Sequence, residues 1–151
     1  MYYRVMLLLI RGLKTLEIRV ERACANARAI AEALRRNPKV SRVFYPGFAG
    51  EPSHEVARRQ MRDFGMMVSF DIKGGGAAAE KFINALQLWY LATSLGGVES
   101  TVSYPLLSSH VGLTDQQLEL LDVSAATVRL SAGIEHPADL VADLEQALDR
   151  L

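Results

Sequence analysis

A glycine-containing turn near the middle of the chain has the composition of an anion-binding loop. Residues 94–100 read SLGGVES. The paired glycines let the backbone pass close to another body, and they expose N–H groups and the Ser94 hydroxyl as hydrogen-bond donors. Such a turn suits a carboxylate or a phosphate. Paired glycines also occur in ordinary tight turns, so the composition leaves both interpretations open.

A second candidate is Arg129, which stands inside the apolar segment VRLS at residues 128–131. A guanidinium group is planar and permanently charged, so its burial is costly unless it meets a carboxylate or faces a cleft. Glu99 or Glu135 could be an internal partner. Arg129 is therefore a candidate anion-binding residue, with a structural ion pair as the alternative.

Other residues that often do chemistry lack the spacing that the chemistry needs. The histidines His54, His110 and His136 are scattered among turns, without metal-ligand spacing. The glycines at 74–76 are not followed by the lysine and hydroxyl of a phosphate-binding loop. No serine has a histidine and an acid at a recognisable hydrolase spacing. We assign these residues no catalytic or metal-binding role.

Length and composition predict a single domain over residues 1–151. Half of the 151 residues are hydrophobic, which is enough for one well-filled core. The 17 basic residues balance the 17 acidic ones, so the charge favours neither a nucleic-acid nor a membrane partner. Cys24 is the single cysteine, which excludes an internal disulfide and is consistent with a cytoplasmic protein. We expect a small molecule or another protein as the partner.

The chain begins with the apolar run MYYRVMLLLI at residues 1–10. This run is too short to span a bilayer and has no signal-peptide cleavage site. We expect a buried segment here, and the abrupt apolar start suggests that another segment once preceded it.

Helices and strands are expected to alternate along the chain. Apolar residues step by threes and fours from Leu13 onward, as on one face of a helix, and Thr114 with Gln117 predicts a capping box. The predicted helices cover residues 13–36, 53–64, 77–86, 114–121 and 137–151, and the predicted strands cover 40–45, 66–72, 88–92 and 127–131. This alternation predicts an α/β fold, a two-layer sandwich in which helices cover a small sheet of about four strands.

Four blocks of the sequence resemble, in order and spacing, the family of cystathionine γ-synthase, cystathionine lyase and methionine γ-lyase. The blocks are RGLKTL at 11–16, YPG at 45–47, SLGGVES at 94–100 and VRLSAGIE at 128–135. The resemblance runs from about Leu7 to Leu151. It implies the C-terminal, substrate-binding domain of a fold-type I pyridoxal-phosphate enzyme, usually a homo-oligomer.

The resemblance also implies roles for the two candidate segments. The family's arginine in the last block, here Arg129, binds the α-carboxylate of the amino-acid substrate, and the serine of SLGG, here Ser94, helps to hold it. An arginine clamp of this kind fixes a substrate so that its Cα–H bond is presented to the cofactor. Thr93 lies where the family's side-chain preference is partly set, so we interpret it as a candidate specificity residue.

The cofactor implied for the complete enzyme is pyridoxal 5′-phosphate, which needs a Schiff-base lysine. The lysines of this chain are Lys14, Lys39, Lys73 and Lys81, and none lies in a segment that resembles the family's cofactor-lysine segment. We therefore expect that the lysine-bearing N-terminal domain is absent, that the cofactor is not bound covalently, and that this chain alone is inactive.

The shared blocks do not select one reaction within the family. Synthases, β-lyases, γ-lyases and sulfhydrylases all carry them, so the resemblance implies elimination or replacement on a sulfur amino acid or an O-acyl homoserine. The alternative is a non-catalytic module that binds amino acids or dimerises.

Overall fold

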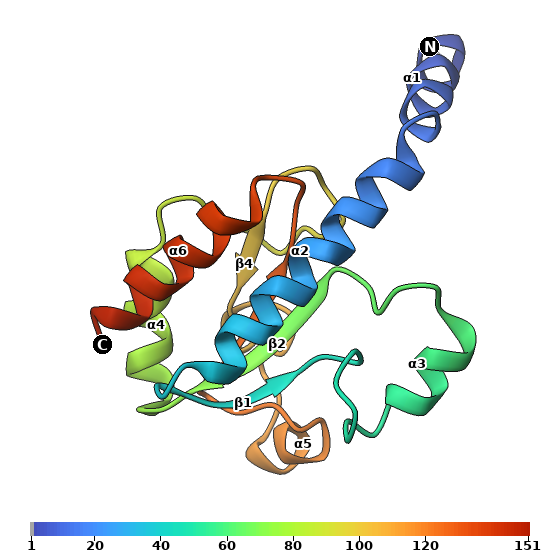
Figure 1. Cartoon of the computed structure of the whole chain (residues 1–151). Helices are drawn as coiled ribbons and strands as arrows, with labels where there is room; N and C mark the ends of the chain where they lie inside the picture. Colours follow the sequence, from blue (N-terminus) through green and yellow to red (C-terminus); the bar gives the residue numbers. More distant parts are fainter. Residues whose placement is uncertain (1) are drawn as a thin grey trace.

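A five-stranded sheet organises the computed structural model, which describes residues 2–151 (Figure 1). The strand order is β1-β2-β5-β4-β3, and β5 at the centre is antiparallel to both β2 and β4. β3 joins the edge of the sheet parallel to β4. The strands are β1 (Val40–Phe44), β2 (Met67–Ile72), β3 (Tyr90–Leu91), β4 (Thr101–Ser103) and β5 (Thr127–Ser131).

Three helices cover one face of this sheet, while the segment that contains η1 and α5 borders the other face. Helices α2, α4 and α6 pack against the sheet, whereas α1 projects away from it (Figure 1). The helices are α1 (Tyr2–Leu13), α2 (Leu16–Arg36), α3 (His54–Gln60), α4 (Gly75–Ala85), α5 (Asp115–Leu120) and α6 (Pro137–Asp149), with the 3₁₀ turn η1 at Pro105–Leu107.

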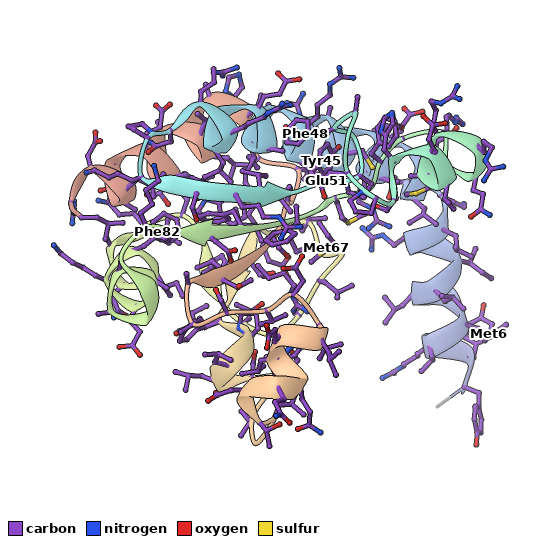
Figure 2. All side chains as sticks on the ribbon, turned by 90° about the horizontal axis from the view of Figure 1, so that it is seen from below. Met6, Tyr45, Phe48, Glu51, Met67 and Phe82 are labelled. Atoms are coloured by element: carbon purple, nitrogen blue, oxygen red, sulfur yellow. The ribbon has the colours of Figure 1, made fainter. Side chains whose placement is uncertain are left out.

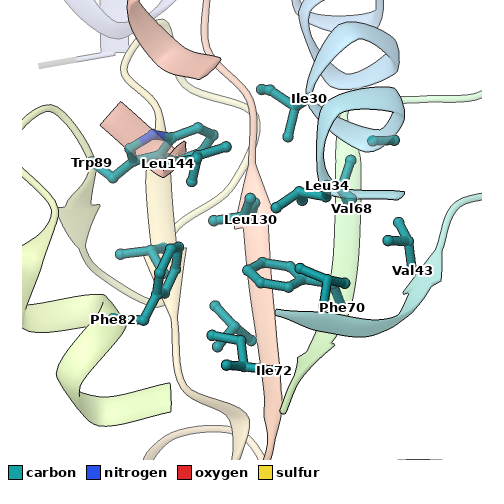
Figure 3. Packing of buried hydrophobic residues seen from close by; sticks show 14 of the residues in the cluster. Ile30, Leu34, Val43, Val68, Phe70, Ile72, Phe82, Trp89, Leu130 and Leu144 are labelled. Atoms are coloured by element: carbon teal, nitrogen blue, oxygen red, sulfur yellow. The ribbon is translucent and has the colours of Figure 1, made fainter. Parts of the chain in front are cut away.

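The hydrophobic core lies between the sheet and these three helices. Side chains alternate along a strand, so Phe70 of β2 and Leu130 of β5 point into the core, where Ile30 of α2 and Leu144 of α6 meet them (Figure 3). The intervening residues of the same strands face the opposite side. That side is polar and carries, among others, Ser69, Asp71, Ser103, Thr127, Arg129 and Ser131.

The expected α/β class and helix-covered sheet are confirmed, and all four predicted strands form. The sheet has five strands instead of about four, because β4 follows the glycine turn as a three-residue strand of mostly hydroxyl side chains. The predicted capping box is confirmed at Thr114 and Gln117. Several predicted helix bounds were too wide, since α2 starts at Leu16, α3 ends at Gln60 and α6 ends at Asp149. Helix α4 starts at Gly75, two residues earlier than predicted.

The expectation of a buried segment at residues 1–10 was wrong for the residues that the structure describes. Helix α1 contains no buried residue, and its side chains, including Met6, stand apart from the sheet (Figure 2). The apolar residues of a helix need an enclosing surface, and those of α1 find none in the described chain. No helix of residues 2–151 combines the length and apolar character needed to cross a membrane.

Candidate functional site

Arg129 lies at the middle of the central strand, on the polar face of the sheet. It is paired in register with Ser69 of β2 and Ser103 of β4. Val128 and Leu130 beside it are fully buried in the core, so the alternation of the strand forces Arg129 to the other side. The guanidinium therefore reaches a partly open surface instead of the hydrocarbon core.

The guanidinium of Arg129 forms no ion pair within the described chain. Its Nη2 donates to the Thr93 carbonyl oxygen at 3.2 Å, and no carboxylate of residues 2–151 lies within 4 Å. The carboxylate of Glu135 accepts hydrogen bonds from Ser100 instead. The ion-pair alternative for Arg129 is therefore not formed with either Glu99 or Glu135.

The SLGGVES turn starts beside Arg129, because Thr93 and Ser94 connect β3 to it. Both residues are exposed, and the Ser94 carbonyl accepts from the Thr101 hydroxyl at 2.9 Å. The Gly96 N–H donates to Ser131 Oγ at 3.1 Å, so this amide does not point outward as the sequence suggested. The Ser94 hydroxyl itself makes no hydrogen bond to residues 2–151 and stays available as a donor.

The far end of the turn is fixed by four residues that we call the Ser100 clasp: Asn26, Ser100, Gly133 and Glu135. Glu135 accepts from the Ser100 N–H at 2.7 Å through Oε1 and from the Ser100 hydroxyl at 2.9 Å through Oε2. The Gly133 N–H donates to Ser100 Oγ at 2.8 Å. Asn26 of α2 donates to the carbonyl oxygens of Gly133 and Glu135 at 3.0 and 2.9 Å. The clasp joins the turn to α2 and to the exit of β5.

Sequence reasoning did not predict the clasp. Ser100 and Glu135 belong to two of the motif blocks, but they are separated by 35 positions and meet only after β4 pairs with β5. The usable signal was a hydroxyl residue, Ser100, and an acidic residue, Glu135, in the two motif blocks that also contain the candidate residues Ser94 and Arg129.

Two cavities with different lining residues border this region. One of about 230 Å³ is lined by Arg129 together with Phe44, Ser69 and His110. The other, of about 430 Å³, is lined by Thr93 together with Leu91, Ser103 and Tyr104. The structure thus brings the Thr93 backbone to the Arg129 guanidinium, while Ser94 borders neither cavity.

Two of the histidines to which we assigned no chemistry contact nearby backbone groups. His136 accepts from the Ala138 N–H at 3.3 Å as the N-cap of α6. His54 lies 2.7 Å from the Pro46 carbonyl oxygen and stacks on Phe64. Burial, followed by the charge of Asp63, raises the pKa of the Cys24 thiol. No group of histidine, cysteine and acidic residues within 2–151 could hold a metal ion.

Two of the four lysines contact backbone carbonyl oxygens away from both cavities. Lys39 Nζ donates to the Leu148 carbonyl at the end of α6, and Lys73 Nζ donates to the Pro38 carbonyl. No lysine lines either cavity beside Arg129 or Thr93. Within residues 2–151, Arg129 and Thr93 therefore line cavities that none of the four lysines borders.

Solved structures share this fold closely. metB from Corynebacterium glutamicum matches with a TM-score of 0.86 and 49% identity, over 93% of this chain and 36% of that chain. A putative O-acetylhomoserine (thiol)-lyase from Campylobacter jejuni matches with a TM-score of 0.89 and 33% identity, over 94% of this chain and 34% of that chain. The fold is that of the C-terminal domain of fold-type I pyridoxal-phosphate enzymes.

The chain belongs to the Cys/Met metabolism PLP-dependent enzyme family, whose model matches residues 4–149. An L-methionine gamma-lyase of Fusobacterium nucleatum is 46% identical over 95% of this chain. A cystathionine beta-lyase of Coxiella burnetii is 44% identical over 93% of this chain. The chain spans about 36% of the length of each of these relatives.

Proposed function

We propose that this chain is the substrate-carboxylate-binding part of a PLP-dependent enzyme that acts on sulfur amino acids or O-acyl homoserine. Arg129 would bind the α-carboxylate through its guanidinium, and the Ser94 hydroxyl would donate a further hydrogen bond. Thr93 would influence which side chain is accepted. The observation that carries this proposal is the Arg129 guanidinium itself, which lines a cavity and forms no ion pair within the described chain. Asp122 lines the same cavity, but its carboxylate is paired with Arg42.

A guanidinium in this position suits a planar carboxylate for two reasons. Its N–H groups form a fork that matches two oxygens, and charge-assisted hydrogen bonds of this kind are stronger than neutral ones. The bond to the Thr93 carbonyl uses one N–H of the fork and orients the rest. A carboxylate held here would place the amino-acid Cα at a defined distance from the sheet.

In the complete enzyme, pyridoxal phosphate would act as an electron sink for elimination or replacement at Cβ or Cγ. The lysine that attaches it would belong to a separate N-terminal domain, since none of the four lysines borders the site. The proposal therefore includes that domain as a partner, a homo-oligomeric cytoplasmic enzyme as the whole, and no covalent cofactor or turnover in this chain alone.

The alternative function is a non-catalytic module that dimerises or binds amino acids. The specific observation in its favour is α1, along which side chains such as Tyr3 and Leu8 are 81% and 65% exposed. An apolar helix in this state is normally covered by another protein surface.

Carboxylate binding can be tested on the isotope-labelled chain by NMR titration. L-Methionine should shift the amide signals of residues 93–100, whereas L-methionine methyl ester, which has no carboxylate, should bind at least about tenfold more weakly. Equal shifts with both compounds would contradict the proposal. Adding a lysine-bearing N-terminal half with pyridoxal phosphate and measuring recovered activity would separate the enzyme from the non-catalytic module.

Arg129→Lys provides the residue-level test. A lysine keeps the charge but loses the fork, so we expect the affinity for L-methionine to fall by roughly tenfold or more, with the ester unaffected. Arg42→Lys is the matched control, because Arg42 also lies on this face of the sheet but is paired with Asp122. A loss of equal size in the control would contradict a specific role for Arg129.

A further inference from the structure

We propose that Glu135 and Ser100 are positioning residues for the carboxylate site, a role that rests on the function proposed above. Neither residue lines the cavity that Arg129 borders. They act on the site through the SLGGVES turn, which directly follows Thr93, whose carbonyl oxygen accepts from the Arg129 guanidinium.

The hydrogen bonds of the clasp fix one end of the turn. Ser100 is completely buried, and its N–H and hydroxyl both donate to the same carboxylate while its Oγ accepts from Gly133. The other end of the turn is tied by the Gly96 bond to Ser131 and the Thr101 bond to the Ser94 carbonyl. With both ends held, the Ser94 hydroxyl and the Thr93 carbonyl occupy one position relative to Arg129.

The clasp also decides where the negative charge of Glu135 lies. Both carboxylate oxygens are hydrogen-bonded to Ser100, so this charge is held at the far end of the turn and forms no ion pair with Arg129. Without these bonds, a carboxylate near the end of the same strand would be a competing partner for the guanidinium. Ser100 therefore helps to keep Arg129 available for a carboxylate that arrives from outside.

Asn26 extends the clasp to the helix layer. Its side chain is 1% exposed and donates to two carbonyl oxygens that flank Ile134, which places the exit of β5 against α2. The Ile134 N–H in turn donates to the Val98 carbonyl within the turn at 2.9 Å. The position of the turn is thus set by the core helix as well as by the sheet.

Glu135→Gln tests this role in the 151-residue chain. Glutamine keeps one acceptor for the Ser100 N–H but presents an amide donor to Ser100 Oγ, so the hydroxyl proton loses its partner. We expect the preference for L-methionine over its methyl ester, measured by the same NMR titration, to fall by roughly tenfold. Loss of stability alone does not predict a change in this ratio.

Asp143→Asn is the matched control. Asp143 is another buried carboxylate that accepts backbone N–H groups, from Gln87 and Leu88, but it lies outside the clasp. The Asp143→Asn variant should be less thermally stable than the wild-type chain but should keep its preference for L-methionine over the methyl ester. If Glu135→Gln does not fold, Ser131→Ala removes only the acceptor of the Gly96 N–H and should lower the same ratio.

The outcomes separate the two proposals. A preference for the carboxylate that survives unchanged in folded Glu135→Gln and in Ser131→Ala would overturn the positioning role and leave the proposed function standing. A wild-type chain without any such preference would overturn the proposed function, and the positioning role with it. If Asp143→Asn lowers the preference for L-methionine over its methyl ester as much as Glu135→Gln does, the effect is due to general destabilisation, and the positioning role is overturned.

Discussion

Gly133 has almost no space around its Cα, and this makes it the most constrained residue of the site. A Cβ built there would overlap the Val98 carbonyl oxygen and approach Glu135 Oε2 to 2.5 Å. Neither neighbour can move freely, because one is backbone and the other is held by Ser100. The absence of a side chain at Gly133 is therefore what allows the turn and the exit of β5 to pack together.

We predict that Gly133→Ala destabilises the chain by about 1–3 kcal/mol, as overpacking does, and weakens carboxylate binding. Gly12→Ala is the control, since nothing lies within 4 Å of a Cβ there and alanine should stabilise α1 by about 0.5–1 kcal/mol. Chemical denaturation measures both changes. A neutral Gly133→Ala would show that the turn can move without cost.

Among single residues, the sequence identifies those that are unusual in their local context and misses those that are common in theirs. Arg129 stood out because a charge interrupts an apolar strand, and Ser94 because it precedes two glycines. Ser100 and Glu135 resemble common surface residues, and their importance depends on a pairing across 35 positions that only the folded sheet creates. For the same reason the sequence left Glu135 as a possible partner of Arg129.

The connection after β1 is an aromatic cluster between α2 and α3. Tyr45 is 2% exposed, and its ring meets Phe48 and Phe64 edge-on at centroid distances of 5.6 and 6.4 Å. Burial, followed by the charges of nearby groups, raises the pKa of Tyr45 from 10.0 to about 12. The folded chain therefore favours the neutral, protonated form of Tyr45 over the phenolate.

This raised pKa predicts a loss of stability in alkali. Between pH 10 and about 12 the unfolded chain has released the Tyr45 proton and the folded chain has kept it. The free energy of unfolding should therefore fall as the pH rises, by at most about 1.4 kcal/mol per pH unit. Tyr45→Phe should flatten this fall in denaturation curves recorded over the same window. An unchanged slope would contradict the assignment, although Tyr104, whose pKa is also raised by burial, contributes part of it.

Elements with a strong local signal were predictable, and those that depend on distant partners were not. The apolar periodicity of α2 and the Thr114 capping box are properties of short segments, and both are confirmed. β4 has three residues and depends on β5 for its hydrogen bonds, so its sequence alone carries little strand signal. The apolar run of α1 was detected, but its exposure depends on which surfaces surround it.

The molecule as a whole exposes more surface than a compact monomer of its mass. The chain has 9377 Å² of accessible surface, whereas a folded monomer of 16.6 kDa is expected to have roughly 7,600 Å². An excess on this scale exceeds one side of a standard protein interface, about 800 Å². Helix α1 supplies a large share of it, because its apolar residues Tyr2, Tyr3, Val5, Met6, Leu7, Leu8, Leu9, Ile10 and Leu13 are all exposed.

We predict that the isolated chain self-associates through α1. Leu8→Glu should shift the distribution toward monomer in sedimentation experiments, because a charge on α1 opposes burial. Val111→Glu is the control, since Val111 and Leu8 are equally exposed, at 65%, and Val111 lies in a different segment. An identical effect of both substitutions would show that association does not depend on α1.

The two edges of the sheet are both unsuitable for adding a strand from another molecule. β1 has a register shift between Val40 and Arg42, and β3 is two residues long. Irregular and very short edge strands are the means by which natural sheets avoid edge-to-edge aggregation. Whatever assembly α1 drives should therefore stay soluble and of limited size, and it should neither grow into fibrils nor bind amyloid dyes.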